Sequence, residues 1–171
     1  MSPCTSLDGM IMKHISRIRA GIAAAMVFAV SACSDGPTQV EFQVIEEVDF
    51  AASLGVDLAT MTKLGSGVYY KDLLVGDGEP VIIASRVNAT YDAWLTDGTH
   101  VISTTYEFVI GNQQVPIGLE GGVFNQREGG VRQIIIPPHV GYGGIAYIGL
   151  DGAEIPPGSV LIYEVTVNGV S

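Results

Sequence analysis

A run of three isoleucines, Ile134–Ile136, leads directly into Pro137 and Pro138. β-Branched residues favour an extended strand, whereas a proline has no N–H group with which to continue the hydrogen-bonding ladder. The next residues, 139–144, place one aromatic residue, Tyr142, among three glycines. The sequence therefore predicts a strand that ends abruptly and a flexible loop that carries a single ring.

The composition of the 171-residue chain favours a domain rich in strands and turns. Apolar residues make up 47% of the chain and charged residues 15%, so a core can form and disorder is disfavoured. The 22 glycines and 8 prolines indicate many turns. The formal net charge of -10 excludes nucleic acid as a partner, because phosphate binding needs clustered Lys and Arg.

The N-terminal residues have the pattern of an export signal. Lys13, Arg17 and Arg19 precede an apolar stretch, residues 20–30, that is too short to span a bilayer. The small residues before Cys33 resemble a bacterial lipoprotein cleavage box, in which the cysteine is lipidated and becomes the first residue. We therefore expect residues 1–32 to be a signal peptide and Cys33 to be the lipidation site. The alternative is an ordinary cleaved signal with an incidental cysteine.

Residues 33–62 are expected to form a tether and an N-terminal extension that packs against the main domain, with a short helix within residues 51–61. The second cysteine, Cys4, lies in the signal peptide, so the mature chain has no disulfide and no cysteine-based metal site. The main domain is expected to run from residue 63 to residue 171.

Alternating hydrophobicity predicts five strands in this domain, within residues 67–78, 87–98, 106–111, 129–136 and 159–167. Val115, Leu119 and Val123 recur every four residues and predict one helix. Three glycines between them each cost roughly 1 kcal/mol of helix propensity, so this helix is expected to be short and held by packing. Antiparallel strands with a single helix indicate an α+β fold.

Aromatic residues on the predicted strands form the most distinctive candidate site. Tyr91, Tyr106, Phe108 and Tyr163 all lie on predicted core-facing positions, and Tyr142 lies on the glycine-rich loop. Such a set either fills a core or lines a concave apolar pocket, and both interpretations remain open here. Residues 141–155 are apolar and rich in glycine, so they are expected to form a flap over that pocket.

The order of five motifs resembles the FKBP-type peptidyl-prolyl isomerases over about residues 66–167. These motifs are SGVYYKDLLVGDG, YDAWLTDG, FVIGNQQVPIGLEGGV, GGVRQIIIPPHVGYG and IPPGSVLIYEV. The resemblance implies an antiparallel sheet of about five strands curled around one short α-helix. It also implies a rotamase that binds the proline of protein substrates in an apolar pocket.

The resemblance further implies the site residues. Tyr91, Tyr142 and Ile155 would be catalytic, with the Tyr142 hydroxyl and the Ile155 N–H as hydrogen-bond donors. The remaining substrate-binding residues would be Tyr106, Phe108, Val115, Pro116, Leu119 and Tyr163. No cofactor or metal is expected, because rotation about an amide bond needs neither.

Several positions depart from the family pattern. Val101 and Ile102 stand where the family usually has Phe-Asp, and the segment that follows them is shorter than usual. Gln114 and Pro116 replace a usual Glu and Ile. Because Ile102 has no side-chain acceptor, we expect one pocket wall to be less polar and the isomerase activity to be reduced.

Three functions remain open on the sequence alone. They are a lipid-anchored isomerase assisting the folding of exported proteins, a peptide-binding or chaperone module with little isomerase activity, and a structural lipoprotein domain. A monomer is expected. Ser34 after the cysteine resembles the sorting signal for the outer membrane, so the expected location is its periplasmic face.

Overall fold

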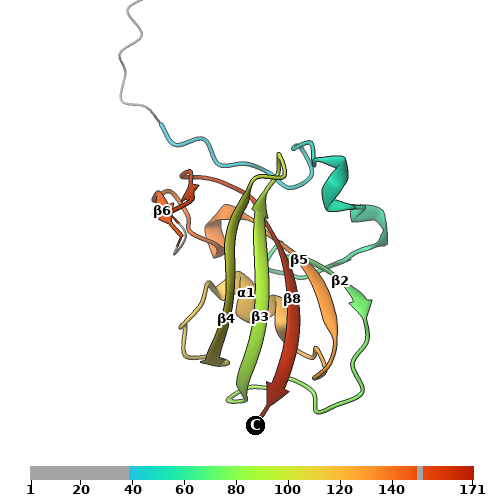
Figure 1. Ribbon diagram of the computed structural model, residues 1–171. Helices are drawn as coiled ribbons and strands as arrows, with labels where there is room; N and C mark the ends of the chain where they lie inside the picture. The colour runs from blue at the N-terminus through green and yellow to red at the C-terminus, as the bar shows by residue number, and fades with distance from the viewer. Residues whose placement is uncertain (1–38, 150–151) are drawn as a thin grey trace, which may run out of the picture. The chain divides into compact units, whose positions relative to one another are not determined.

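The computed structural model describes residues 39–149 and 152–171, in which a six-stranded antiparallel sheet curls around one short helix (Figure 1). This arrangement confirms the predicted α+β fold class. The strand order is β1-β2-β5-β8-β3-β4, and a separate hairpin pairs β6 with β7. The strands are β1 Thr62–Lys63, β2 Tyr69–Leu74, β3 Arg86–Leu95, β4 His100–Val109, β5 Val131–Ile136, β6 Tyr147–Ile148, β7 Glu154–Ile155 and β8 Leu161–Val170, and the α-helix is α1 Ile117–Val123.

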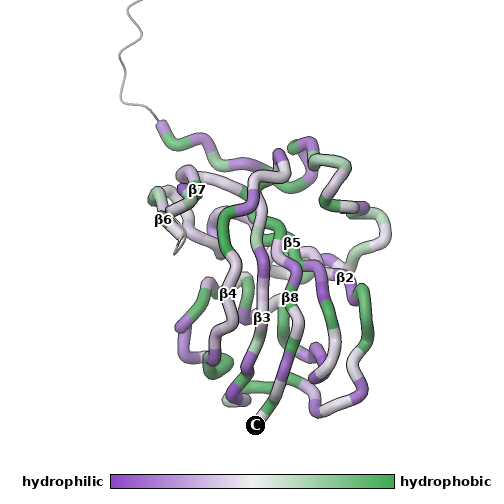
Figure 2. The backbone as a smooth tube through the Cα atoms, in the orientation of Figure 1, coloured by the Kyte–Doolittle hydropathy of each residue, from purple (hydrophilic) through white to green (hydrophobic). Residues whose placement is uncertain are grey.

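Period-two patterning places one face of β3 and β8 in the core. Figure 2 shows the short hydrophobic and hydrophilic stretches that alternate along the strands. On β3, Val87, Ala89, Tyr91 and Ala93 are buried, because successive side chains of a strand point to opposite faces. Their partners on β8 include Val165, which lies opposite Tyr91. The face formed in this way is covered by α1.

The glycines of α1 allow the helix to lie directly on β5. A Cβ atom added to Gly122 would come within 2.5 Å of Ile134 Cγ2, and one added to Gly118 would overlap Ile136 Cγ2. Gly118 and Gly122, which weaken the isolated helix, are thus required for its packing, whereas a Cβ atom at Gly121 would meet nothing within 4 Å. The helix is short and packs on the sheet, as the sequence predicted. Within residues 39–149 and 152–171, no helix combines the length and the apolar character needed to cross a membrane.

β5 is buried on both faces, which explains its unbroken isoleucine run. Ile134 and Ile136 belong to the core under α1, whereas Ile135 belongs to a second core on the opposite face. That second core also contains Ile45 from the N-terminal extension. A strand that is buried on both faces has a continuous hydrophobic sequence, because neither face contacts water.

The N-terminal extension packs against the sheet, as expected. Phe50 and Met61 cover the second core, and the Gln133 side chain donates a hydrogen bond of 2.8 Å to the Leu54 carbonyl. The predicted short helix within residues 51–61 is instead two 3-10 turns, η1 Ala52–Leu54 and η2 Leu58–Thr60. Gly55 ends the first turn in the left-handed region, with φ of 60°, and so prevents a continuous helix.

The structure extends one predicted strand and shortens another. The strand predicted at residues 106–111 is only the end of β4, which begins at His100. β2 ends at Leu74, before the predicted turn at residues 76–78. Tyr106 pairs with buried Ala89 and stacks on Phe108, which confirms its predicted face, but 43% of its surface is exposed because it lies at the cavity. Residues 103–105 are polar, so the hydrophobic pattern does not indicate that β4 runs through them.

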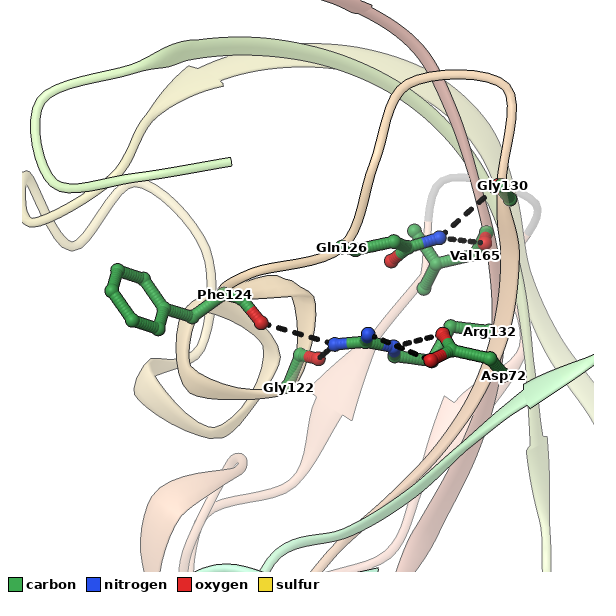
Figure 3. Close-up of polar contacts among 7 residues, drawn as sticks. All are labelled: Asp72, Gly122, Phe124, Gln126, Gly130, Arg132 and Val165. Carbon is green, nitrogen blue, oxygen red and sulfur yellow. Dashed lines mark hydrogen bonds and ion pairs between the residues drawn. The ribbon is translucent and has the colours of Figure 1, made fainter. Parts of the chain in front are cut away.

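A buried arginine joins α1 to the sheet. The Arg132 guanidinium binds the Asp72 carboxylate through two hydrogen bonds of 2.7 and 3.1 Å (Figure 3). Its third nitrogen donates to the carbonyls of Gly122 and Phe124, where α1 ends. The guanidinium also lies 4.4 Å from the centre of the Tyr70 ring. One side chain of β5 therefore satisfies polar groups at the end of the helix and on β2.

We expect Arg132→Met to lower the free energy of unfolding by about 3–5 kcal/mol, because it leaves a carboxylate and two carbonyls without their partner. Arg132→Lys keeps the charge but loses the planar fork, so its loss is expected to be smaller. Urea unfolding followed by circular dichroism measures both. A loss below about 1 kcal/mol for Arg132→Met would contradict this role.

Candidate functional site

A cavity of about 450 Å³ lies between the helix side of the sheet, the loop before α1 and the flap, residues 141–155. None of its lining residues is charged. They are Tyr91, Thr104, Tyr106, Gln113, Gln114, Val115, Pro116, Gly141, Tyr142 and Tyr147. The cavity therefore presents aromatic rings, two amides and hydroxyl groups to a ligand.

The sheet provides one wall of the cavity through its register. Tyr91 on β3 lies opposite Thr104 on β4, and Ala89 lies opposite Tyr106. Paired residues of an antiparallel sheet share a face, so these side chains point to the side on which α1 lies. Because Ala89 is small, the Tyr106 ring has room beside it at the edge of the sheet.

The loop between β4 and α1 provides a second wall. The Gln114 side chain accepts a hydrogen bond of 2.8 Å from the Val109 N–H, which closes the loop onto the end of β4. Gln113 has φ of 54°, a left-handed conformation that is uncommon for a residue with a side chain. Pro116 precedes the helix, and its carbonyl accepts from the N–H groups of Leu119 and Glu120.

The flap provides the third wall and carries two stacked rings. After Pro137 the chain forms the 3-10 turn η3, Pro138–Val140, and the Gly143 N–H donates to the Pro138 carbonyl at 2.8 Å. This turn places Tyr142 next to Tyr147, with ring centres 4.2 Å apart and planes inclined by 18°. The proline stop therefore ends β5 and turns the chain so that Tyr142 reaches the cavity.

Burial favours the protonated form of three tyrosine hydroxyls in or beneath the cavity. Burial, followed by the electrostatic influence of Tyr142, raises the pKa of Tyr91 to about 12. Burial also raises the pKa of Tyr142. Tyr163 lies fully buried beneath the cavity with a pKa raised well above its usual value by burial, and its hydroxyl makes no hydrogen bond of regular geometry, although Tyr142 is close. These hydroxyls act as neutral donors.

Five of the nine residues that the resemblance implied line the cavity, namely Tyr91, Tyr106, Val115, Pro116 and Tyr142. The other four are buried in the core beneath it, namely Phe108, Leu119, Ile155 and Tyr163. Ile155 lies on β7 opposite Tyr147. Five of the nine residues therefore contact the cavity, and the other four form the core on which the cavity wall packs. Cys33, the expected lipidation site, lies outside the described residues.

Five further residues line the cavity, although no sequence pattern places them there: Thr104, Gln113, Gln114, Gly141 and Tyr147. Gln114 was noted only as a departure from the family pattern. Tyr147 lies within the predicted flap. As a second tyrosine on an otherwise aliphatic segment, it is the residue that a sequence pattern could have assigned to the cavity. Thr104 reveals its position only through strand register.

Val101 and Ile102 are both buried in the core, although neighbouring residues of a strand normally face opposite sides. The register explains this, because Ala93 lies opposite Ile102 and Trp94 lies opposite His100, which leaves Val101 as the extra residue of a β-bulge. The two apolar side chains fill the position where the family usually has an aromatic and a carboxylate. The cavity consequently has no carboxylate.

In the part of the chain that the structure describes, no group of three or more His, Cys, Asp or Glu side chains is placed to hold a metal ion. His100 instead forms a pair with Asp92, with 3.0 Å between His100 Nε2 and Asp92 Oδ1, and its ring contacts Trp94 edge-on. His139 Nε2 lies 3.1 Å from the Ser66 carbonyl. Both histidines have structural partners.

Comparison with known proteins agrees with this geometry. The model of the FKBP-type peptidyl-prolyl cis-trans isomerase family matches residues 79–168. An FK506-binding protein of Neisseria meningitidis serogroup B is 32% identical over 104 residues, which cover 58% of this chain and 92% of that protein. The peptidyl-prolyl cis-trans isomerase FKBP9 of Homo sapiens is 41% identical over 80 residues, which cover 44% of this chain.

Solved structures of the family superpose on the chain. AtFKBP13 matches with a TM-score of 0.58 and 27% identity, covering 65% of this chain and 98% of that one. FkpA from Escherichia coli matches with a TM-score of 0.56 and 25% identity, covering 66% of this chain and 52% of that one. The chain belongs to the FKBP-type peptidyl-prolyl cis-trans isomerase family. It spans only 13% of the length of FKBP9.

We expect Tyr142→Phe to lower kcat/KM for an X–Pro peptide roughly fivefold, because it removes one hydrogen-bond donor while keeping the ring. Tyr142→Ala should lower it at least another tenfold, since the stacking on Tyr147 is lost as well. A coupled or direct assay of peptide isomerisation measures both, and urea unfolding checks that the Phe variant keeps its stability. Equal activity in all three proteins would place Tyr142 outside the working site.

Proposed function

We propose that this chain is a peptidyl-prolyl cis-trans isomerase that assists the folding of exported proteins. The observation that carries the proposal is the uncharged aromatic cavity beneath Tyr142. Membership of the family supports isomerase activity in general. One chain supplies every wall of the cavity, so we propose that the monomer is active.

The chemistry needs an apolar site more than a reactive group. Rotation about the X–Pro bond faces a barrier of roughly 18–20 kcal/mol, because the amide loses its resonance as it twists. The twisted amide has less charge separation than the planar one, so an apolar, water-poor cavity binds it better than the ground state. Stronger binding of the transition state than of the substrate is what accelerates a reaction.

The cavity residues suggest separate roles. Tyr91, Tyr106 and Val115 would hold the prolyl ring, since they offer the apolar surface. The Tyr142 hydroxyl, which burial keeps protonated, would donate a hydrogen bond to a carbonyl of the substrate. Thr104, Gln113 and Gln114 would bind the flanking backbone, because hydroxyl and amide groups pair with peptide N–H and C=O. No cofactor enters this mechanism.

A peptide-binding or chaperone module with little isomerase activity is the second candidate. The buried pair Val101 and Ile102 favours it, because the family's usual carboxylate at this wall is absent. The two candidates differ in turnover but share prolyl-peptide binding. Binding of FK506, the ligand named for several relatives, would report on the cavity in both cases.

We expect measurable isomerase activity that is lower than that of an ordinary family member, with a preference for an apolar residue before proline.

Ile102→Asp alone should not restore the rate, because a misplacement of the carboxylate by about 1 Å can lower the rate a hundredfold. It should also destabilise the domain by about 1–3 kcal/mol, since the new carboxylate is buried without a partner. Lengthening the segment after residue 102 together with Ile102→Asp should do better than either change alone.

Peptide isomerisation and FK506 titration of the chain that lacks residues 1–32 measure these effects, with Ile102→Val as the matched control. Turnover equal to that of an ordinary family member would contradict the reduced activity. Binding of FK506 and prolyl peptides without turnover would favour the second candidate. Failure to bind either ligand would leave only a structural role.

We further propose that the protein is a lipoprotein, cleaved before Cys33 and attached through lipid on that cysteine to the periplasmic face of the outer membrane. The basic, apolar and small-residue segments before Cys33 support this proposal, and Ser34 supports the choice of membrane. The excess of Asp and Glu over Lys and Arg argues against a basic patch that binds anionic lipid, so attachment would depend on the acyl chains.

Cys33→Ser should therefore abolish metabolic labelling with radioactive palmitate and move the protein out of the membrane fraction. One acyl chain holds a protein weakly and several hold it firmly, so complete release is expected when none is attached. Cys4→Ser is the matched control and should change neither property. Retention of Cys33→Ser in washed membranes would argue against a lipid anchor.

A further inference from the structure

We propose that Gln43 is a positioning residue for the flap, through which the N-terminal extension holds Tyr142 over the cavity. The proposal rests on the proposed isomerase function. It concerns a segment, residues 41–43, that lies outside the matched family region and that we call the strap. The contacts that carry it run from the strap through Gly158 to Gly143.

Gln43 clips the strap to the chain that leaves the flap. Its backbone N–H donates a hydrogen bond of 2.9 Å to the Gly158 carbonyl. Its side-chain Oε1 accepts a hydrogen bond of 2.7 Å from the Val160 N–H, just before β8 begins. One residue therefore binds two backbone groups of the segment that connects the flap to the sheet.

Gly158 allows the strap to approach this closely. Its φ of 78° is a conformation that favours glycine. A Cβ atom at this position would overlap the Glu41 carbonyl oxygen and would lie 3.3 Å from Phe42 Cα. The strap thus lies directly on the backbone of Gly158, where only a glycine leaves space for it.

Gly158 passes the contact on to the loop that carries Tyr142. The Gly158 N–H donates a hydrogen bond of 2.8 Å to the carbonyl of Gly143, the residue that follows Tyr142. The Phe42 ring adds a second contact, since its Cζ atom lies 3.3 Å from where a Cβ of Gly144 would be. The strap therefore supports both glycines that come directly after the tyrosine.

The outer edge of the flap is largely exposed in its described part, residues 141–149 and 152–155. Ile145 and Ile148 have 75% and 68% of their surfaces exposed, so they contribute little burial. Segments with few buried apolar contacts open locally at low cost. Hydrogen bonds at the base of such a segment therefore affect how often its functional groups are in position. A displacement of about 1 Å of those groups can lower the reaction rate a hundredfold.

The test compares three substitutions in the full chain. Gln43→Leu keeps the approximate size and removes the acceptor, whereas Gln43→Glu retains an oxygen for the Val160 N–H. Gln39→Leu makes the same change at an exposed position four residues earlier. We expect Gln43→Leu to lower kcat/KM for an X–Pro peptide roughly fivefold, Gln43→Glu to recover most of that loss, and Gln39→Leu to match the parent.

Amide hydrogen exchange separates positioning from general stability. Gln43→Leu should speed exchange at Gly158 and Val160 roughly tenfold while leaving the amides at the centre of β5 unchanged. Unchanged exchange at Gly158, or equal loss of kcat/KM with Leu and Glu, would overturn the proposal. If the parent chain shows no isomerase activity, the proposed function fails, and affinity for a prolyl peptide replaces kcat/KM in the same comparison.

Discussion

The close approach of α1 to β5 is the constraint on which the rest of the structure depends. Gly118 and Gly122 remove the side chains that would keep the helix away from Ile134 and Ile136. Arg132 then satisfies the carbonyls at the end of the helix and pairs with Asp72 on β2. Because the helix is fixed at this depth, the loop before it and the flap after β5 meet over the same face of the sheet.

Much of the fold follows from local patterns, and the exceptions have physical causes. The alternation in β3 and β8 and the four-residue spacing around Leu119 predict their elements correctly, since each buries one face. The polar residues of β4 hide this strand from hydrophobic patterning, since it lies at the edge of the sheet and, among the described residues, pairs with β3 alone. The bulge at Val101 is equally invisible, because two adjacent apolar residues reveal nothing about register.

Only part of the candidate site can be predicted from the sequence. A resemblance identifies which rings belong to the site region, but their position along the strand decides which of them reach the cavity. Tyr106 and Phe108 are two residues apart and were both placed in the pocket wall, yet Tyr106 lines the cavity and Phe108 is 1% exposed beneath it. Thr104 and the contacts of Gln43 depend on residues that are distant in sequence, so no local pattern marks them.

The lining of the cavity has a consequence for the surroundings in which the protein can work. No carboxylate, amine or imidazole contributes to it, and burial raises the pKa of Tyr91 to about 12. Mild acidification or a change in salt would therefore alter the charged exterior while leaving the charge of the cavity the same, because protonation of carboxylates and screening act on charges that the cavity lining does not have. The cavity therefore keeps one charge state while the charge of the exterior changes.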